Sequence, residues 1–493
     1  MRRRKRWVTI CQLIIGVVFI LTGTFLYFQF EWLYDKILNT ALTISPTSTA
    51  FKVWRKNDPP LIMDIYLFNW TNPEDIRVPG VKPRLQEIGP YRFKEVKEKM
   101  NITFDDAKKT VSYMHRKLYH FDAENSVRNL SDVITTLNAV PLAIAYKFRD
   151  ANIFVKKGIS FGLSSMGTKV HVTKTAGEIL FDGYKDDILS ALSWLPINDV
   201  KEKFGIFYGK NGTIGNDGRY VMSVANDKNF GKLLSWNDRK ETNFYTGQCN
   251  SMKGSAGEFY PLNRKRDRIQ FYSSELCRLA TLEYERDVVI KGVQAYRYTA
   301  RNIFDNGTLR KENACFCTGE CQPSGVLNVS NCRLNSPSFL SFPHFYNADP
   351  YYTEAVEGLN PNNPKHEFYI TMQPKTGIIM DLSAKMQLNF LLRPDDSISI
   401  YNDVPKIFFP IFYFDQDVRM RDELAQNLLM IQNLPEYSNY LIMILMFLGV
   451  LNIAWFVCSV FYCRKTKFPQ NTQSGEEVPL QENVIKQGLV LVN

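Results

Sequence analysis

The sequence predicts one large α+β domain, mainly antiparallel, that lies outside a membrane between two terminal transmembrane helices. Two observations predict the helices: an uncharged apolar run follows a basic block near the start of the chain, and another precedes a basic block near its end. A third observation predicts the domain, since strand-like runs and turn signals fill most of the intervening residues without an internal repeat.

The first transmembrane helix is predicted at residues 7–30, behind a cytosolic segment, residues 1–6, that contains five basic side chains. At roughly 1.5 Å per residue, a helix of this length crosses a hydrocarbon core of about 30 Å. Because basic flanks stay in the cytosol, the chain from Glu31 onward is expected outside. A cleaved signal peptide is the alternative, but the apolar run is too long and residues 25–28 are too bulky for a small-residue cleavage site.

The second transmembrane helix is predicted at residues 439–463, and the basic residues that follow it mark a cytosolic tail at residues 464–493. A buried core helix is the alternative, and the length and basic flank of the run disfavour it. Residues 31–438 are therefore expected to form one outer domain. The formal net charge of +10 gives no indication of nucleic-acid binding, because half of it belongs to residues 2–6, beside an anionic leaflet.

Glycosylation sequons support this topology, because all six lie between the predicted spans. They begin at Asn69, Asn101, Asn129, Asn211, Asn306 and Asn328. Cysteine usage agrees with an oxidising compartment, since six of the nine cysteines lie in the same region: Cys249, Cys277, Cys315, Cys317, Cys321 and Cys332. Six cysteines predict three disulfides, with 15 pairings open.

Cysteines can also bind zinc or carry a palmitoyl group. A zinc cluster at Cys315, Cys317 and Cys321 is disfavoured, because thiols outside the cell are oxidised rather than bound to metal, and no metal or other cofactor is expected. Cys463 and Cys458 lie near the cytosolic end of the second span and are candidates for palmitoylation. For Cys458 the alternative is a small apolar residue in a helix.

Apolar periodicity predicts the elements of the outer domain. Strands are expected at residues 61–68, 91–93, 111–118, 367–372 and 384–392, and a helical continuation of the first span at 30–39. Residues 130–195 are expected to form a small bundle of two or three helices, one of them at 133–154 and another after a capping box of Thr175 and Glu178. The Asn-Asp-Gly turn at 216–218 predicts a hairpin.

One motif suggests an enzyme. Residues 158–162 read Gly-Ile-Ser-Phe-Gly, which matches the nucleophile elbow of serine hydrolases with Ser160 as nucleophile and His344 or His366 as a base. The elbow requires a strand, a sharp turn and a helix, whereas Ser160 follows a helical pattern. We therefore expect a protein that is not an enzyme.

A basic rim suggests a binding site. Lys156, Lys157 and Lys169 flank an apolar segment at residues 159–166. Cations beside apolar side chains suit an anionic amphiphile such as a fatty acid or a phospholipid. The alternative is an ordinary solvated helix end, where lysines are favoured by the helix dipole.

Several motifs together carry a family resemblance. Phe-Asn-Trp-Thr-Asn-Pro-Glu stands at residues 68–74, Glu-Ile-Gly-Pro-Tyr at 87–91, Leu-Ser-Trp-Asn at 234–237, Cys-Phe-Cys at 315–317, Ser-Phe-Pro-His-Phe at 341–345 and Gly-Leu-Asn-Pro at 358–361. Through nearly its whole length the chain resembles the class B scavenger receptor family, which includes fatty-acid translocase and the lysosomal integral membrane proteins. The first motif most resembles the insect croquemort-like branch.

The resemblance implies an antiparallel β-barrel with an internal hydrophobic tunnel and a membrane-distal helical bundle, which corresponds to residues 130–195. Basic residues at this apex meet lipids, lipoproteins, or apoptotic and microbial surfaces, and Lys156 and Lys157 are nearest to them in character. The family's apical lysine falls near residues 164–166, where this chain has none. The disulfide pattern of the fatty-acid translocase branch, carried over, gives Cys249–Cys315, Cys277–Cys332 and Cys317–Cys321.

The resemblance thus implies a plasma-membrane scavenger receptor that binds and transfers lipid, and it leaves homo-oligomer formation open. The alternative is an endosomal or lysosomal sorting receptor. Residues 476–481 nearly make an acidic dileucine signal, but Gln481 stands where leucine or isoleucine is required.

The topology can be tested directly. The basic clusters that flank the two spans should keep both tails in the cytosol. Tags at either end should therefore be protected from protease added to intact cells. Trimming of a C-terminal tag from outside would contradict the two-span topology.

Overall fold

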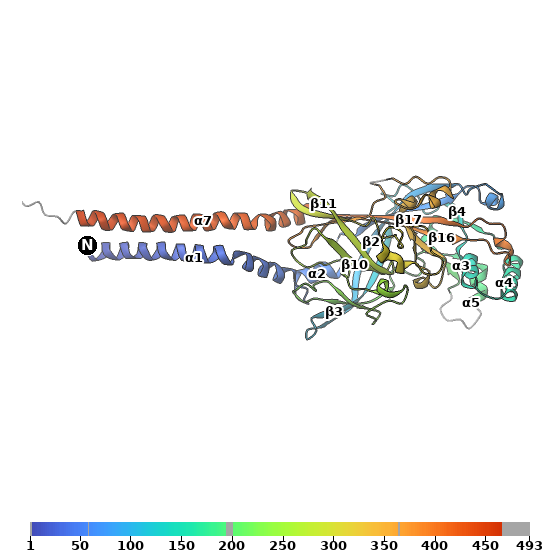
Figure 1. Ribbon diagram of the computed structural model, residues 1–493, viewed down its shortest axis with the longest axis horizontal. Coiled ribbons are helices and arrows are strands. Elements are labelled where there is room, and N and C mark those ends of the chain that lie inside the picture. The colour runs from blue at the N-terminus through green and yellow to red at the C-terminus, as the bar shows by residue number, and fades with distance from the viewer. Residues whose placement is uncertain (1, 58, 194–200, 363–364, 466–493) are drawn as a thin grey trace, which may run out of the picture. The chain divides into compact units, whose positions relative to one another are not determined.

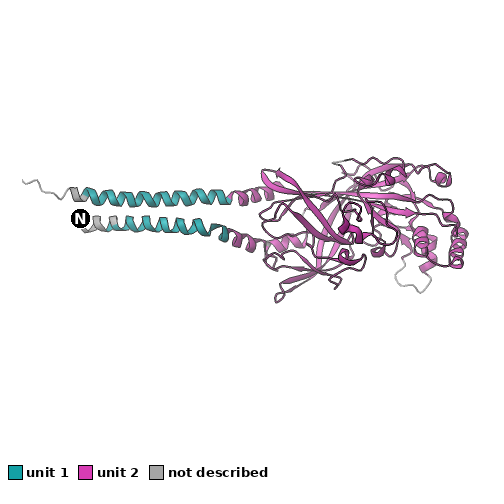
Figure 2. Ribbon diagram, in the orientation of Figure 1, with its two compact units in different colours: residues 1–33, 434–493 teal, residues 34–433 magenta. Residues whose placement is uncertain are grey.

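The computed structural model describes residues 2–57, 59–193, 201–362 and 365–465 (Figure 1). Two compact units divide the chain. Unit 1 contains residues 1–33 and 434–493, and unit 2 contains residues 34–433 (Figure 2). The near-dileucine segment and most of the predicted cytosolic tail lie outside the described residues.

Unit 1 is built from two long helices, α1 (Arg2–Leu42) and α7 (Asp422–Lys465), whose outer turns continue into unit 2. Both are long and apolar enough to cross a membrane, and they contain the predicted spans 7–30 and 439–463. Within this unit the helices approach each other at two glycines, since a Cβ on Gly16 would lie 2.9 Å from the carbonyl oxygen of Gly449. In lipid the hydrophobic effect does not drive helices together, so helices associate through close packing, which small residues such as glycine allow.

Unit 2 is organised around one antiparallel sheet of 13 strands, in the order β10-β11-β12-β15-β16-β17-β1-β2-β3-β8-β9, with β13 and β14 branching from β16. The strands are β1 (Leu61–Trp70), β2 (Leu85–Asp105), β3 (Thr110–Phe121), β8 (Ile214–Ser223), β9 (Leu233–Trp236), β10 (Arg268–Ser273), β11 (Arg278–Ile290), β12 (Val293–Thr299), β13 (Leu327–Asn328), β14 (Ser338–Ser341), β15 (Tyr369–Met372), β16 (Ile379–Leu392) and β17 (Ile407–Arg419). These bounds confirm the predicted strands, including the three residues 91–93 inside the much longer β2.

The sheet curls into a nearly closed barrel because a single segment bridges its two edges. Ser255 pairs with Lys232, just before β9, and with Phe271 of β10. The short helix α2 (Thr49–Arg55) packs near one end, where its Trp54 is 4% exposed and donates a hydrogen bond to Glu258. The predicted barrel and the α+β class are confirmed, whereas the tunnel through the barrel stays a prediction.

The helical region is only partly as predicted. Val133–Leu137 is strand β4, paired with β5 (His171–Thr175), and not the start of a helix. Three short helices, α3 (Ala139–Lys147), α4 (Ile153–Ser165) and α5 (Asp187–Ser193), gather at the end of unit 2 remote from α2 (Figure 1). Residues 133–136 are all β-branched, which favours a strand. Pairing with β5 therefore determines the structure here, although the apolar spacing also suits a helix.

The capping box forms, but it caps a different element. The Thr175 hydroxyl accepts from the Glu178 N–H, and the Glu178 carboxylate accepts from the Thr175 N–H. The element that follows is a π-helical turn, Glu178–Asp182, rather than a long helix, before the short strand β6 (Tyr184–Lys185), which pairs with β7 (Lys203–Phe204). The hairpin prediction at 216–218 is wrong, because these residues lie inside β8, next to a register shift against β3.

Disulfides join the loops on one side of the barrel. The structure pairs Cys249 with Cys315, Cys277 with Cys332 and Cys317 with Cys321, the same three pairs that the family resemblance implies. Among the described residues, Cys11 and Cys458 carry free thiols, and the side chain of Cys463 lies outside the described part of the chain.

A glycine in the Gly-Leu-Asn-Pro motif offers a test of the packing. Gly358 has a φ of 91°, and a Cβ there would lie 1.9 Å from the carbonyl oxygen of Leu85, while Gly80 has a φ of 79° with nothing within 4 Å. Gly80→Ala should cost roughly 1–2 kcal/mol of backbone strain. Gly358→Ala should cost about 1–3 kcal/mol more from the clash. Thermal unfolding in detergent measures both, and equal shifts in Tm would contradict this packing.

Candidate functional site

Helix α4 presents two faces of different character. Asn152 caps its N-terminus by accepting a hydrogen bond from the Val155 N–H. Phe154, Lys157 and Phe161, at helical spacings of three and four residues, form the outer face, where the two phenylalanines are 85% and 77% exposed. Two large aromatic side chains at this exposure on one helix face make it a candidate surface for apolar contact.

Gly158 lies between these two phenylalanines on the outer face. A Cβ built there would meet nothing within 4 Å, and the same holds at Gly162. The missing side chains leave the surface between the aromatic rings open. Ile153 and Met166, 57% and 41% exposed, extend the apolar surface at the two ends of the helix.

The inner face of α4 contacts the loop before β17. Lys156, Ser160 and Leu163 lie on this face, at spacings of four and three residues. The Lys156 ammonium is 2.9 Å from the Asp395 carboxylate, and both side chains are more than four-fifths buried. Lys156 is therefore engaged in an ion pair that fastens α4 to the domain and is not a free cation for an anionic ligand.

Lys157 and Lys169 reach different segments. The Lys157 side chain is exposed and donates one long hydrogen bond, 3.4 Å, to the carbonyl of Asp396. Lys169 follows α4 and pairs at 3.2 Å with Glu74, in the turn after β1, with both side chains mostly exposed. Exposed pairs of this kind contribute little and exchange readily with solvent, so both ammonium groups remain accessible.

The nucleophile-elbow interpretation fails on geometry. Ser160 lies inside α4 rather than at a turn between a strand and a helix, and its hydroxyl donates to the Ser399 hydroxyl while accepting from the Ser399 N–H. Neither His344 nor His366 contacts it. In the described structure Ser160 joins the helix to its supporting loop.

The two histidines instead form a buried cluster at the barrel wall. Their rings stack with centroids 4.8 Å apart, and His344 lies 2.5 Å from the carboxylate of Glu87 on β2. Asn360 and Asn362 donate backbone N–H groups to His344 and His366, respectively. This cluster holds the family motif at 341–345 against β2, and no interaction in it points to catalysis.

Three sequons have exposed asparagines, Asn101, Asn129 and Asn211. The other three, Asn69, Asn306 and Asn328, are partly buried. Asn69 also accepts a hydrogen bond from the Thr135 N–H with its side-chain oxygen. Glycosylation at all six positions stays a prediction, as does palmitoylation of Cys458 and Cys463.

Sequence reasoning identified the lysines and missed the aromatic pair. Phe154 and Phe161 lie seven residues apart, which places them on one face of a helix. Gly158 between them and Gly162 after them indicate that no large side chain covers this face. The sequence predicts an apolar segment at 159–166 beside the lysines, but the pattern alone does not distinguish exposed apolar side chains from buried ones. Only the structure shows that the polar face, with Lys156 and Ser160, is the inner one.

An antiparallel domain between two helices that are each long and apolar enough to cross a membrane defines a membrane protein anchored at both ends. Comparison with known proteins identifies the family. The CD36 family profile matches residues 14–460, and the chain belongs to this family, the class B scavenger receptors.

Three relatives cover nearly the whole domain. Protein peste of Drosophila melanogaster is 34% identical over 450 residues, 90% of this chain and 81% of its own. Scavenger receptor class B member 1 of Rattus norvegicus is 32% identical, with 89% and 87% covered. Lysosome membrane protein 2 of Homo sapiens is 34% identical, with 87% and 90% covered.

The stacked histidines predict a pH dependence of stability. Burial lowers the pKa of His366 to about 3, helped by the neighbouring His344, Lys365 and Lys385 and opposed by Glu87. In the unfolded chain His366 binds a proton with a pKa near 6.5, whereas in the folded state it stays neutral until about pH 3. The free energy of unfolding therefore decreases as the pH drops below about 6.5. His366→Gln should reduce the loss of Tm between pH 7.4 and pH 5 by about 1–3 °C.

The exposed His120 provides the matched control. His120→Gln should leave the pH dependence of Tm unchanged. Burial also lowers the pKa values of His115 and His171, and these two residues contribute to the dependence that remains in His366→Gln. An unchanged dependence in His366→Gln would show that this ring is not protected from protonation.

Proposed function

We propose that this receptor docks lipid-bearing particles through the outer face of α4 and transfers lipid from them. The exposure of Phe154 and Phe161 beside Lys157 carries the proposal. Burying an aromatic side chain contributes about 1.5–3 kcal/mol, so two rings at the surface of a particle supply most of the holding energy. Lys157 adds attraction to an anionic headgroup.

Family membership supports a lipid or lipoprotein ligand, because relatives in this family are named as scavenger receptors. It also supports a receptor rather than an enzyme, in keeping with the position of Ser160 inside α4. Apoptotic or microbial surfaces present the same combination of anionic headgroups and acyl chains. They remain within the proposed ligand class.

The plasma membrane is our proposed location, and the endosomal or lysosomal membrane is the alternative. The match to scavenger receptor class B member 1 supports the plasma membrane, and the match to lysosome membrane protein 2 supports the alternative. Biotinylation of intact cells distinguishes them, because a surface receptor is labelled at steady state. A receptor that is labelled only after permeabilisation belongs to the internal membrane.

Vesicle binding tests the docking surface. In the double variant Phe154→Ser/Phe161→Ser, binding to phosphatidylcholine vesicles with and without phosphatidylserine should fall more than tenfold, because the apolar contact is lost. Lys157→Ala should weaken binding only to the anionic vesicles and flatten its salt dependence. Flotation with purified full-length protein in nanodiscs measures both effects.

Two further variants make the test specific. Leu334→Ser removes an apolar side chain that is 96% exposed elsewhere on unit 2 and should leave vesicle binding unchanged. Lys156→Ala should lower Tm rather than vesicle affinity, since it leaves the buried Asp395 without its partner. Unaltered binding by the phenylalanine double variant would refute docking through α4.

A further inference from the structure

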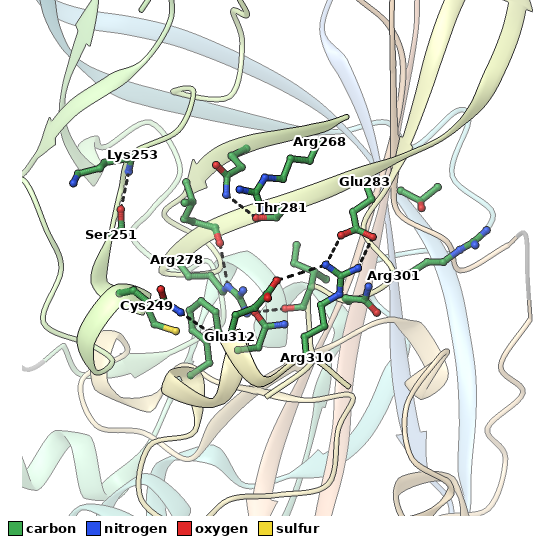
Figure 3. Close-up of a pocket in the computed structure, with 18 of the residues that line it drawn as sticks. Cys249, Ser251, Lys253, Arg268, Arg278, Thr281, Glu283, Arg301, Arg310 and Glu312 are labelled. Atoms are coloured by element: carbon green, nitrogen blue, oxygen red, sulfur yellow. Dashed lines mark hydrogen bonds and ion pairs between the residues drawn. The ribbon is translucent and has the colours of Figure 1, made fainter. Parts of the chain in front are cut away.

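A polar cavity of about 790 Å³ lies in unit 2 (Figure 3), and none of the residues that line it belongs to α4. Its lining residues all fall between positions 248 and 316. Most of them come from the turns Gly247–Asn250 and Lys311–Phe316 and from strands β10, β11 and β12, and the rest from the adjoining loops. The volume is within the range of roughly 300–1,000 Å³ that is usual for small-molecule sites.

Hydroxyl and amide side chains dominate the uncharged lining. Ser251, Gln270, Thr281, Thr299 and Asn302 line the cavity, whereas the apolar contributions are few. Such a surface offers hydrogen-bond donors and acceptors to a hydroxylated ligand. It gives an acyl chain little apolar area to bury.

Positive charge exceeds negative charge around the cavity. Five cationic residues line it: Lys253, Arg268, Arg278, Arg301 and Arg310. The three carboxylates that line it are already engaged. Arg310 pairs with Glu283 and Glu312 (Figure 3). Arg301 pairs with Glu285. Across the described residues, the other three cations form no ion pair.

Arg278 is the most unusual of these three. It is 4% exposed, and its guanidinium lies 3.2 Å from the ring centroid of Phe316. Two of its N–H groups donate to the carbonyls of Leu279 and Ile303, at 3.2 and 2.9 Å. Desolvation lowers the pKa of this guanidinium to about 10. The buried Asp305 offsets part of this charge without forming an ion pair with it, since its carboxylate accepts hydrogen bonds from Leu309, Arg310 and Asn313. The rest of the desolvation cost is not offset, and a bound anion would relieve it.

The walls of the cavity are fixed in advance. The Cys249–Cys315 disulfide joins the two turns that line it, and the Gln248 side chain donates to the carbonyl of Glu312. The carbonyl contacts of Arg278 hold its guanidinium in one orientation. A site held in this way loses little conformational entropy when a ligand binds.

We propose that this cavity binds a sulfate or phosphate ester on a hydroxylated body, in other words a sulfated or phosphorylated sugar. The guanidinium fork of Arg268 matches the oxygens of such an ester, the N–H groups of Arg278 that do not donate to carbonyls supply a second contact, and Lys253 supplies a third charge. The hydroxyl and amide lining takes the sugar. The ligand is either a free saccharide or the end of a glycan chain on another molecule, and it is separate from the lipid that α4 docks.

Calorimetry on the detergent-solubilised full chain tests this proposal with a 6-O-sulfated heparin disaccharide. The sulfated disaccharide should bind, and the same disaccharide without sulfate should bind at least tenfold more weakly. Arg268→Gln/Lys253→Gln should reduce the affinity about tenfold, because both side chains are exposed at the rim and their removal leaves the fold intact. Arg278→Lys keeps the charge but loses the planar group that the two carbonyls and Phe316 hold in place, and should also weaken binding.

Matched controls separate this site from a general charge effect and from α4. Lys265→Gln removes an exposed charge three residues before Arg268 without touching the cavity and should not alter the affinity. Phe154→Ser/Phe161→Ser should leave disaccharide binding intact even where it abolishes vesicle binding. A longer sulfated heparin chain that binds tighter than the disaccharide, and loses this gain in the rim variant, would identify a glycan chain as the source.

Three outcomes would overturn the proposal. The first is equal binding of the sulfated and unsulfated disaccharides, or no binding of either. The second is unchanged affinity in Arg268→Gln/Lys253→Gln. The third is binding of phosphatidic-acid vesicles that the rim variant abolishes while the disaccharide fails to bind, which would assign the cavity to a lipid headgroup.

Discussion

Pairing of β1 with β17 is the constraint on which the rest of the domain depends. Residues 64–67 of the first strand align with residues 412–415 of the last, so the beginning and the end of unit 2 lie side by side in the centre of one sheet. On one side of this pair the sheet continues through β2, β3, β8 and β9, and on the other side through β16, β15, β12, β11 and β10. Closing so long a loop is entropically expensive, and the long ladders of β16 on β17 and β2 on β1 and β3 compensate for it. The outcome is a domain whose two ends leave from adjacent strands, as a protein with two terminal spans requires.

Much of this architecture could be predicted from the sequence, because its signals are local. Alternation and apolar runs placed β1, β3 and β16, and uncharged runs with basic flanks placed α1 and α7. The errors arose where a tertiary contact decides the structure. Residues 133–137 have apolar spacing that suits a helix, yet they pair with β5, and the turn sequence at 216–218 is absorbed into β8 beside a register shift. The disulfide pairing followed from the family resemblance and was open to 15 arrangements on residue count alone.

The candidate site shows a more general limit, since a sequence counts charges but does not show which of them are neutralised. Lys156 and Lys157 are neighbours with the same chemistry, yet one is buried against Asp395 and the other faces solvent. A helix turns by about 100° per residue, so adjacent side chains necessarily point to different faces. The same holds for Arg278 and Arg310, both of which line one cavity. Arg310 is neutralised by two glutamates, whereas Arg278 depends on two carbonyls and an aromatic ring.

The two surfaces described above therefore use different physical forces within one domain. Docking through α4 relies on apolar area, which salt barely affects, with a single lysine adding a screened attraction. The polar cavity relies on charge and oriented hydrogen bonds, and part of its charge is screened by salt because two of the three unpaired cations lie at an exposed rim. Raising the ionic strength should lower the affinity of the cavity for its ligand and leave the affinity of α4 for lipid nearly unchanged. α4 and the cavity share no residue, so lipid and sulfated glycan would bind at separate places on the domain, each with its own dependence on salt.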